Sequence, residues 1–423
     1  MSQIVVTGDT GLNGSVTISG SKNSALPILA ASIMIDETIV LDNVPELRDI
    51  FTMLSILQRI GRKVSFSGNT VRIEPGEIVV GNIPYELIGK MRASFNLLGP
   101  LAVRCGWAKV GKPGGCNIGQ RPVDYHLRGL RKLGFRISEQ HGDVLAVSPG
   151  SFDDLIHYRL PYPSVGATEQ LMTVASLMKG SKVVIENAAR EPEVCDLQGF
   201  LNGCGADVKG AGTSVIEIVG KEVLHGTDYR VIPDRVEAGT YLFAGLATLG
   251  EVTVKSVIPE HLAVPMEIMR EIGGVIDVTE DSVHIGASSP LRAVKVSSEP
   301  YPGFPTDLQP LLTVTLSTAN GESVVEEGVF ENRFGYVDEL NRMGADVKVC
   351  NRKAFIKGVS GLSGAEIKAP DIRATAALIV AGLIAEGETI IHEAAHIFRG
   401  YEKIQTKLKD LGAVIKVFPD EGG

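Results

Sequence analysis

The chain has 423 residues, of which 44% are hydrophobic and 22% charged, a composition typical of a globular protein with two or three domains. A formal net charge of −9 and a single tryptophan argue against a nucleic-acid partner, because such partners favour basic surfaces with aromatic stacking faces. The chain shows no charged-then-apolar leader and no apolar run of ~18 residues, so we expect a cytoplasmic protein without membrane insertion.

The predicted elements recur along the chain with a spacing of about 70 residues. In chain order, helices that are apolar nearly all round are predicted at 25–34, 93–103, 168–178, 240–250, 308–317 and 375–385. A second helix-like stretch in each copy ends at a glycine that leads into alternating apolar residues: Gly61, Gly134, Gly205, Gly273, Gly344 and Gly412. The sequence therefore predicts six copies of one unit, in the order helix, strand, helix, strand, strand.

Helices that are apolar all round must be buried, so the pattern predicts sheets outside and apolar helices inside. Three copies can close around a common axis, and six would form two similar domains with a cleft between them. We expect one domain over residues 22–232, with the Cys116 loop, and a second over 1–21 and 233–423. The strand-like segment at 3–9 would then pair in the second domain. An open solenoid is the alternative, and the lack of a polar capping repeat disfavours it.

Polar residues precede each apolar helix at nearly the same phase of the repeat. They are Lys22 and Asn23, Arg92, Ser164 to Thr168, Asp234 and Arg235, Asp307, and Asp371 and Arg373. Cations at a helix N-terminus oppose the helix dipole, and a bound anion would explain them. Arg121, Arg333 and Arg399 add groups suited to phosphate and carboxylate. For each residue alone, a helix cap or a surface salt bridge is the alternative.

The five cysteines form no C-x-x-C pair, which favours reduced thiols over a disulfide framework or a zinc site. Cys195, Cys204 and Cys350 lie in apolar contexts and are expected to be buried. Cys116 differs, because glycines surround it and Lys112 and Arg121 lie nearby. Neighbouring cations stabilise a thiolate, so Cys116 is predicted to be a nucleophile or a general acid–base group. A thiol redox protein, the alternative, would need a resolving cysteine, and Cys105 is the only candidate.

The string H-E-A-A-H between His392 and His396 matches a zinc-binding pattern. It continues a strand-like segment and lacks a helix-capping residue. We therefore expect a strand followed by a turn at this place, and no metal site.

The whole chain resembles the family of UDP-N-acetylglucosamine 1-carboxyvinyltransferases, which are enolpyruvyl transferases. The resemblance is carried by GSKNSALPILAAS, PGGCNIGQRPVDYHLRGL, SVGAT, YRVIPDRVEAGTYL, FENRFGYVDELNRMGADV and HIFRGYEKI. It implies an α/β fold, a two-domain inside-out α/β barrel built from six βαβαββ-like repeats. It also implies transfer of the enolpyruvyl group of phosphoenolpyruvate to the 3′-hydroxyl of UDP-N-acetylglucosamine, with release of phosphate. This reaction serves peptidoglycan synthesis, and hence cell shape and division, without a metal or organic cofactor.

The resemblance also implies roles for individual residues. Cys116 would be the general acid at C3 of phosphoenolpyruvate and the target of fosfomycin, and Asp307 the base for the sugar hydroxyl. Lys22, Arg121 and Arg399 would hold the phosphate, with Arg333 and Arg373 near the carboxylate. Lys22 and Arg399 also count among the catalytic groups. The sugar-nucleotide site would be lined by Asn23, Arg92, Arg121, Pro122, Val123, Asp124, Tyr125, Ser164, Val165, Gly166, Asp307 and Val329.

The chain departs from the family pattern at Tyr162, Ile372 and Phe398, where lysine, leucine and an acidic residue are common. Two rival functions remain. A shikimate 3-phosphate enolpyruvyl transferase shares the six-repeat fold but lacks the Cys116 loop. A catalytically silent sugar-nucleotide sensor would not need Cys116, Asp307 and the arginines. The sequence does not define an oligomeric state.

Overall fold

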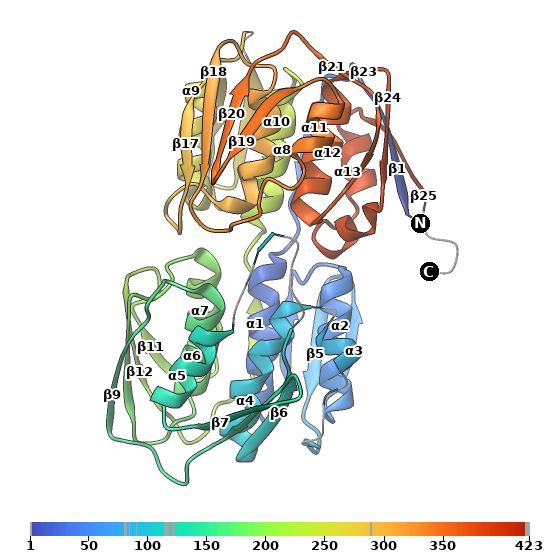
Figure 1. The fold of residues 1–423 in the computed structure, drawn as a ribbon. Coiled ribbons are helices and arrows are strands. Elements are labelled where there is room, and N and C mark those ends of the chain that lie inside the picture. Colours follow the sequence, from blue (N-terminus) through green and yellow to red (C-terminus); the bar gives the residue numbers. More distant parts are fainter. Residues whose placement is uncertain are drawn as a thin grey trace. The chain divides into compact units, whose positions relative to one another are not determined.

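The computed structural model describes residues 2–79, 83, 85–89, 91–113, 118–119, 123–287 and 290–418. These residues form two compact units, each with its own hydrophobic core (Figure 1). The terminal unit comprises the described residues of Met1–Ser19, Cys116–Gln120 and Pro233–Gly423. The central unit comprises those of Gly20–Gly115 and Arg121–Ile232. Nowhere in these ranges is a helix both long and apolar enough to cross a membrane.

The central unit has three sheets among its described residues. Their strand orders are β13(Asp228–Arg230)-β3(Ile39–Asp42)-β5(Thr70–Glu74)-β4(Lys63–Ser67), β11(Asp207–Lys209)-β12(Val215–Val219)-β10(Lys182–Glu186)-β9(Leu155–Arg159), and β6(Trp107–Gly111)-β8(Asp143–Val147)-β7(Arg136–Gln140). The helices are α1(Lys22–Ala31), η1(Ser32–Met34), α2(Arg48–Arg59), α3(Tyr85–Ile88), η2(Arg92–Leu97), α4(Leu98–Cys105), α5(Asp124–Lys132), α6(Val165–Ala175) and α7(Pro192–Gly203). The helices α1 and α6 are buried almost all round and contact each other, as expected for inner helices.

The terminal unit has three larger sheets and a two-stranded one, again among described residues. The strand orders are β22(Glu366–Lys368)-β24(Glu388–His392)-β1(Gln3–Thr7)-β25(Val414–Phe418), β15(Gly274–Val278)-β16(Ser282–Ala287)-β14(Glu251–Lys255)-β2(Asn13–Thr17), β17(Lys295–Ser298)-β18(Glu322–Glu327)-β20(Lys353–Lys357)-β19(Asp346–Cys350), and β21(Leu362–Ser363)-β23(Ala385–Glu386). The helices are α8(Arg235–Ala247), η3(Pro259–Leu262), α9(Ala263–Ile272), η4(Thr306–Leu308), α10(Gln309–Leu316), α11(Val337–Arg342), α12(Ile372–Ile384), η5(Ala394–Arg399) and α13(Ile404–Asp410). The buried helices α8, α10 and α12 contact one another inside the unit (Figure 1).

Five of these sheets share one pairing pattern: a parallel pair at one edge, followed by two antiparallel pairs. In three of them the parallel pairs are β3 with β13, β10 with β9 and β18 with β17. In the other two, β14 pairs with β2 and β24 with β22. The N-terminal strand β1 lies between β24 and β25, with Ile4 opposite Ile391 and Val417. The predicted pairing of the first strand with the C-terminal part of the chain is therefore confirmed.

The helix ends follow the local sequence signals. All six predicted glycines have positive φ angles, between 90° and 122°, and each lies between a helix and a strand. The side chains of Ser21, Ser164, Asp234 and Asp371 accept hydrogen bonds from backbone N–H groups in the first turns of α1, α6, α8 and α12. The polar residues before these four inner helices therefore include their caps.

The expected burial of Cys350 is wrong. Cys350 is exposed, whereas Cys204 is buried and Cys195 is half-buried. Cys350 ends the edge strand β19 beside the turn to β20, where it pairs with Lys353. An apolar neighbourhood in the sequence does not bury a side chain at the tip of an edge hairpin.

Candidate functional site

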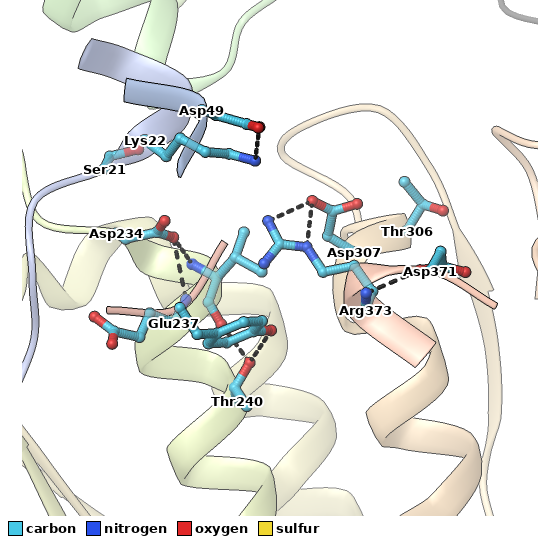
Figure 2. A network of polar contacts seen from close by, with 12 residues as sticks. Ser21, Lys22, Asp49, Asp234, Glu237, Thr240, Thr306, Asp307, Asp371 and Arg373 are labelled. Carbon is cyan, nitrogen blue, oxygen red and sulfur yellow. Dashed lines mark hydrogen bonds and ion pairs between the residues drawn. The ribbon is translucent and has the colours of Figure 1, made fainter. Parts of the chain in front are cut away.

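The terminal unit places one carboxylate between two guanidinium groups. Arg333 donates from Nη2 to Oδ1 of Asp307 at 2.7 Å. Arg373 donates from Nε to Oδ2 of the same carboxylate at 3.0 Å, and its Nη2 lies 2.9 Å from that oxygen (Figure 2). Asp307 lies in η4 directly before α10, and Arg373 lies in the first turn of α12. Arg333 and Arg373 are only 2% and 6% exposed. Burying their charges would be costly without the Asp307 carboxylate or another anion to pair with them.

Arg373 is held from several sides. Its backbone N–H donates to Oδ1 of Asp371 at 2.8 Å, and its Cζ lies 5.4 Å from the centroid of the Tyr401 ring. The Tyr401 hydroxyl in turn lies 2.9 Å from Oγ1 of Thr240. Burial alone would lower the pKa of Arg373, but the Asp307 carboxylate and Tyr401 raise it above its usual value. Nη1 of Arg373 is buried without a hydrogen-bond partner, and a ligand oxygen would satisfy this donor.

Arg333 is positioned by the turn after β18. Its Nε donates to the carbonyl oxygen of Thr306 at 3.1 Å, and its Nη1 lies 3.8 Å from Oδ1 of Asp371. Glu327, at the end of β18, accepts from the backbone N–H of Val329 at 2.7 Å and from Oγ1 of Thr306 at 2.9 Å. Through these two hydrogen bonds, Glu327 links the turn at Val329 to η4, the element that carries Asp307. Glu327 was not expected as a site residue, because its only signal in the sequence is an acidic residue directly before a glycine.

Arg399 is half-buried at the end of η5, which packs against α12. A Cβ on the next residue, Gly400, would lie 2.7 Å from Cγ2 of Ile372 and 3.8 Å from Nη1 of Arg373. Only a residue without a side chain allows η5 to approach α12 this closely. The terminal unit thus brings Asp307, Arg333 and Arg373 together and places the η5 turn beside them.

The Cys116 loop is only partly described. Cys116, Arg121 and Pro122 lie outside the described residues. The carbonyl oxygen of Ile118 accepts from the backbone N–H of Asn332 at 3.0 Å. A Cβ on Gly119 would lie 2.3 Å from Oε2 of Glu331. Two residues of this loop therefore contact the segment that leads into Arg333.

In the central unit, Lys22 is the first residue of α1 and is almost fully buried. Its Nζ lies 3.1 Å from Oδ2 of Asp49, a buried residue of α2 (Figure 2). The next residue, Asn23, is exposed. Asp49 thus holds an ammonium group at a helix N-terminus that the dipole would otherwise disfavour. Asp49 was not expected as a site residue, because a lone aspartate in the first turn of a helix is common.

The other expected nucleotide-site residues of this unit are divided among three elements. Arg92 begins η2, the half-buried run Ser164 to Gly166 leads into α6, and Val123, Asp124 and Tyr125 lie at the start of α5. A Cβ on Gly166 would lie 3.0 Å from Cε1 of His126, so the imidazole ring packs directly against this glycine. The expected residues therefore lie at the N-terminal ends of elements in one unit.

Two aromatic features of this region were not expected. The rings of Tyr125 and Tyr162 are stacked, with centroids 6.4 Å apart and an interplanar angle of 18°. Tyr162, a departure from the family pattern, thus packs on an expected site residue. Burial, reinforced by the charge of Arg92, lowers the pKa of His126 to about 3. His126 is therefore neutral near pH 7.

At the H-E-x-x-H string a strand followed by a turn was expected, and the string begins at the last residue of a strand. His392 ends β24, with Nε2 3.4 Å from Oε2 of Glu366, and His396 lies in η5. Across the ranges that the structure covers, no group of three or more His, Cys, Asp or Glu side chains is arranged to hold a metal ion.

Comparisons with known proteins agree over almost the whole chain. The family model described as EPSP synthase (3-phosphoshikimate 1-carboxyvinyltransferase) matches residues 6–408. The UDP-N-acetylglucosamine 1-carboxyvinyltransferase of Kosmotoga olearia is 63% identical over 421 residues, and that of Thermotoga maritima is 52% identical over 421, each covering 100% of both chains. The crystal structure of the enolpyruvyl transferase NikO from Streptomyces tendae superposes with a TM-score of 0.89 at 24% identity, over 98% of both chains. At that identity the likeness shows a shared fold.

Proposed function

The chain belongs to the UDP-N-acetylglucosamine 1-carboxyvinyltransferase family, within the α/β enolpyruvyl transferases, and we propose that it transfers the enolpyruvyl group of phosphoenolpyruvate to the 3′-hydroxyl of UDP-N-acetylglucosamine. Phosphate is the second product, and the reaction serves peptidoglycan synthesis for the bacterial cell wall. The observation that carries the proposal is 63% identity over the whole length, together with the arrangement of Asp307 between Arg333 and Arg373.

The proposed chemistry begins with proton transfer to C3 of phosphoenolpyruvate, which makes C2 an oxocarbenium-like electrophile. Cys116 supplies this proton in the proposal, and the 3′-hydroxyl of the sugar attacks C2. In the proposal Asp307 takes the hydroxyl proton, and the two guanidinium groups that donate to its carboxylate hold it in place. A positioned acid and a positioned base are each worth about 10²–10⁴-fold in rate. The tetrahedral adduct then loses phosphate and a C3 proton, which leaves the enolpyruvyl ether.

The cations have separate proposed roles. Arg333 and Arg373 bind the carboxylate of phosphoenolpyruvate, and the unpaired Nη1 of Arg373 is a suitable donor. Lys22, Arg121 and Arg399 bind its phosphate and stabilise the charge that develops on it. These steps are proton transfers, the formation of one C–O bond and the cleavage of another, without redox change, so the proposal includes no cofactor.

The sugar nucleotide is assigned to residues that lie mostly at the N-terminal ends of helices, with Val329 in the turn after β18. These are Asn23, Arg92, Arg121, Pro122, Val123, Asp124, Tyr125, Ser164, Val165, Gly166, Asp307 and Val329. In support, the described members from the central unit lie at the beginnings of α1, η2, α5 and α6. Free N–H groups at such ends favour the anionic groups of a nucleotide diphosphate.

We further propose two domains, one at 22–232 and one at 1–21 with 233–423, each an inside-out barrel of three βαβαββ-like repeats. Three observations support this architecture: the pairing pattern shared by five sheets, the buried inner helices, and the six glycines with positive φ between helix and strand. We also propose a cytoplasmic location, because both substrates are soluble metabolites of that compartment.

The test measures phosphate release from phosphoenolpyruvate with UDP-N-acetylglucosamine or with shikimate 3-phosphate as acceptor. We expect phosphate release with UDP-N-acetylglucosamine as acceptor and none with shikimate 3-phosphate. The variant Asp307→Asn should lower kcat by about 10²–10⁴-fold while UDP-N-acetylglucosamine still binds. Release with shikimate 3-phosphate instead would support the rival transferase. Tight binding of the sugar nucleotide without any turnover would support the silent sensor. Undiminished turnover by Asp307→Asn would exclude Asp307 as the base.

A further inference from the structure

A buried carboxyl group lies in the first turns of α6, and the proposed chemistry does not use it. Glu169 is 4% exposed, and its Oε2 accepts a hydrogen bond from Nδ2 of Asn96 in η2 at 3.1 Å. Its Oε1 is buried and has no hydrogen-bond partner. Burying a carboxyl group costs free energy unless the group is neutral or both of its oxygens are hydrogen-bonded. Only one oxygen of Glu169 has such a bond.

The next residue makes a parallel connection. Gln170 donates from Nε2 to the carbonyl oxygen of Phe95 at 2.9 Å, and its Oε1 lies 3.2 Å from Nδ1 of His126. A carbonyl oxygen can only accept, so Nδ1 of the neutral His126 carries the proton. Consecutive residues of α6 therefore hold consecutive residues of η2, and the second of them also holds α5.

The charges around Glu169 favour its neutral form. Burial raises the pKa of Glu169 well above its usual value, and the carboxylates of Glu193 and Glu191 in and beside α7 add to the shift. The hydrogen bond from Asn96 opposes it. A protonated carboxyl group still accepts from an amide through its carbonyl oxygen, so the contact with Asn96 does not need the negative charge.

The elements joined in this way carry residues assigned to the sugar nucleotide. Arg92 begins η2, four residues before Asn96, and Ser164 caps α6, five residues before Glu169. We propose that Glu169 is a positioning residue for the sugar-nucleotide site, which holds η2 and its Arg92 against the first turn of α6. This inference rests on the proposed function, because Arg92 and Ser164 are assigned to the nucleotide there.

The test is calorimetric titration of UDP-N-acetylglucosamine, without phosphoenolpyruvate, at pH 7. Glu169→Leu leaves the buried amide of Asn96 unpaired, and we expect it to weaken binding about tenfold, the size of one lost buried hydrogen bond. Glu169→Gln resembles the protonated acid, so its affinity for UDP-N-acetylglucosamine should stay within about twofold of wild type. Thr173→Val is the matched control, because it removes a buried hydroxyl one turn further along α6 whose described hydrogen bond goes to the backbone carbonyl of Glu169 and not to η2. It should bind as wild type does.

A second variant protects the test against a misfolded Glu169→Leu. Asn96→Ala removes the other partner and should cause a similar loss, and the double variant should bind no more weakly than either single one, because both break the same contact. In steady state, KM for the sugar nucleotide should rise while KM for phosphoenolpyruvate stays the same.

Three outcomes would overturn the inference: wild-type affinity in Glu169→Leu, fully additive losses in the double variant, or a loss in Glu169→Gln as large as in Glu169→Leu. Failure of the wild-type protein to bind UDP-N-acetylglucosamine at all would instead overturn the proposed function.

Discussion

At the scale of single residues, His126 shows how burial changes the chemistry of a side chain. Its pKa falls from 6.5 to about 3 in the folded protein, first through burial and then through the charge of Arg92. The unfolded chain binds a proton near pH 6.5, whereas the folded protein does not until about pH 3. The stability linked to His126 is therefore complete above pH 6.5 and is lost as the pH falls through the range between these two values.

Replacing His126 by asparagine should remove this pH dependence. The Asn Nδ2 can donate to Gln170 in place of the ring Nδ1, but it does not titrate. Between pH 6.5 and 5 we expect wild type to lose about 2 kcal/mol more in the free energy of unfolding than His126→Asn loses. Urea denaturation across this range measures the difference. Parallel pH profiles would show that His126 is protonated in the folded protein.

At the scale of elements, the junctions from helix to strand depend on backbone conformation. Gly344 follows α11 with φ at 97°, and a Cβ there would meet nothing within 4 Å. Gly61 follows α2 with φ at 103°, but its Cβ would lie 1.9 Å from the carbonyl oxygen of Glu77. A substitution at Gly344 therefore tests backbone strain alone, whereas one at Gly61 tests backbone strain together with steric overlap.

We expect Gly344→Ala to lower the free energy of unfolding by about 1–2 kcal/mol, the cost of a left-handed conformation for an L-residue. Gly61→Ala should cost clearly more, because the Glu77 backbone must also move. Urea denaturation of the two variants provides the comparison. Equal losses would mean that the segment around Glu77 adjusts freely.

At the scale of the whole molecule, the chain order of the segments does not match their structural units. The N-terminal strand β1 belongs to the terminal unit and pairs with β24 and β25, about 400 residues further along the chain. Ile4 of β1 and Ile28 of α1 are both fully buried, but they lie in the cores of different units.

Ile4→Ala and Ile28→Ala should therefore have reciprocal effects. Each should cost about 2–5 kcal/mol, and hydrogen exchange should show lost protection mainly in the unit that carries the change. For Ile4→Ala the affected amides are those of β24 and β25, and for Ile28→Ala they are those of α1 and α6. Equal loss of protection in both units from either variant would show that the molecule unfolds as one cooperative body.

The sequence by itself determined the parts of the structure that depend on local patterns. Apolar residues nearly all round identified the inner helices, and the glycines marked the junctions from the second helices to the strands. The caps formed by Ser21 and Asp371 are also local features, because a capping side chain bonds to N–H groups only two or three residues ahead of it. The family was also evident from the sequence, since the motifs extend over the whole chain.

Only the tertiary structure decided which distant groups meet. Asp307 is 26 residues from Arg333 and 66 residues from Arg373, and no local pattern states that one carboxylate binds both. The exposure of Cys350 and the raised pKa of Glu169 also depend on the elements packed around them. Periodicity identifies the face of an element that is buried, but the pairing and protonation of buried polar groups depend on neighbours that only the folded chain brings into contact.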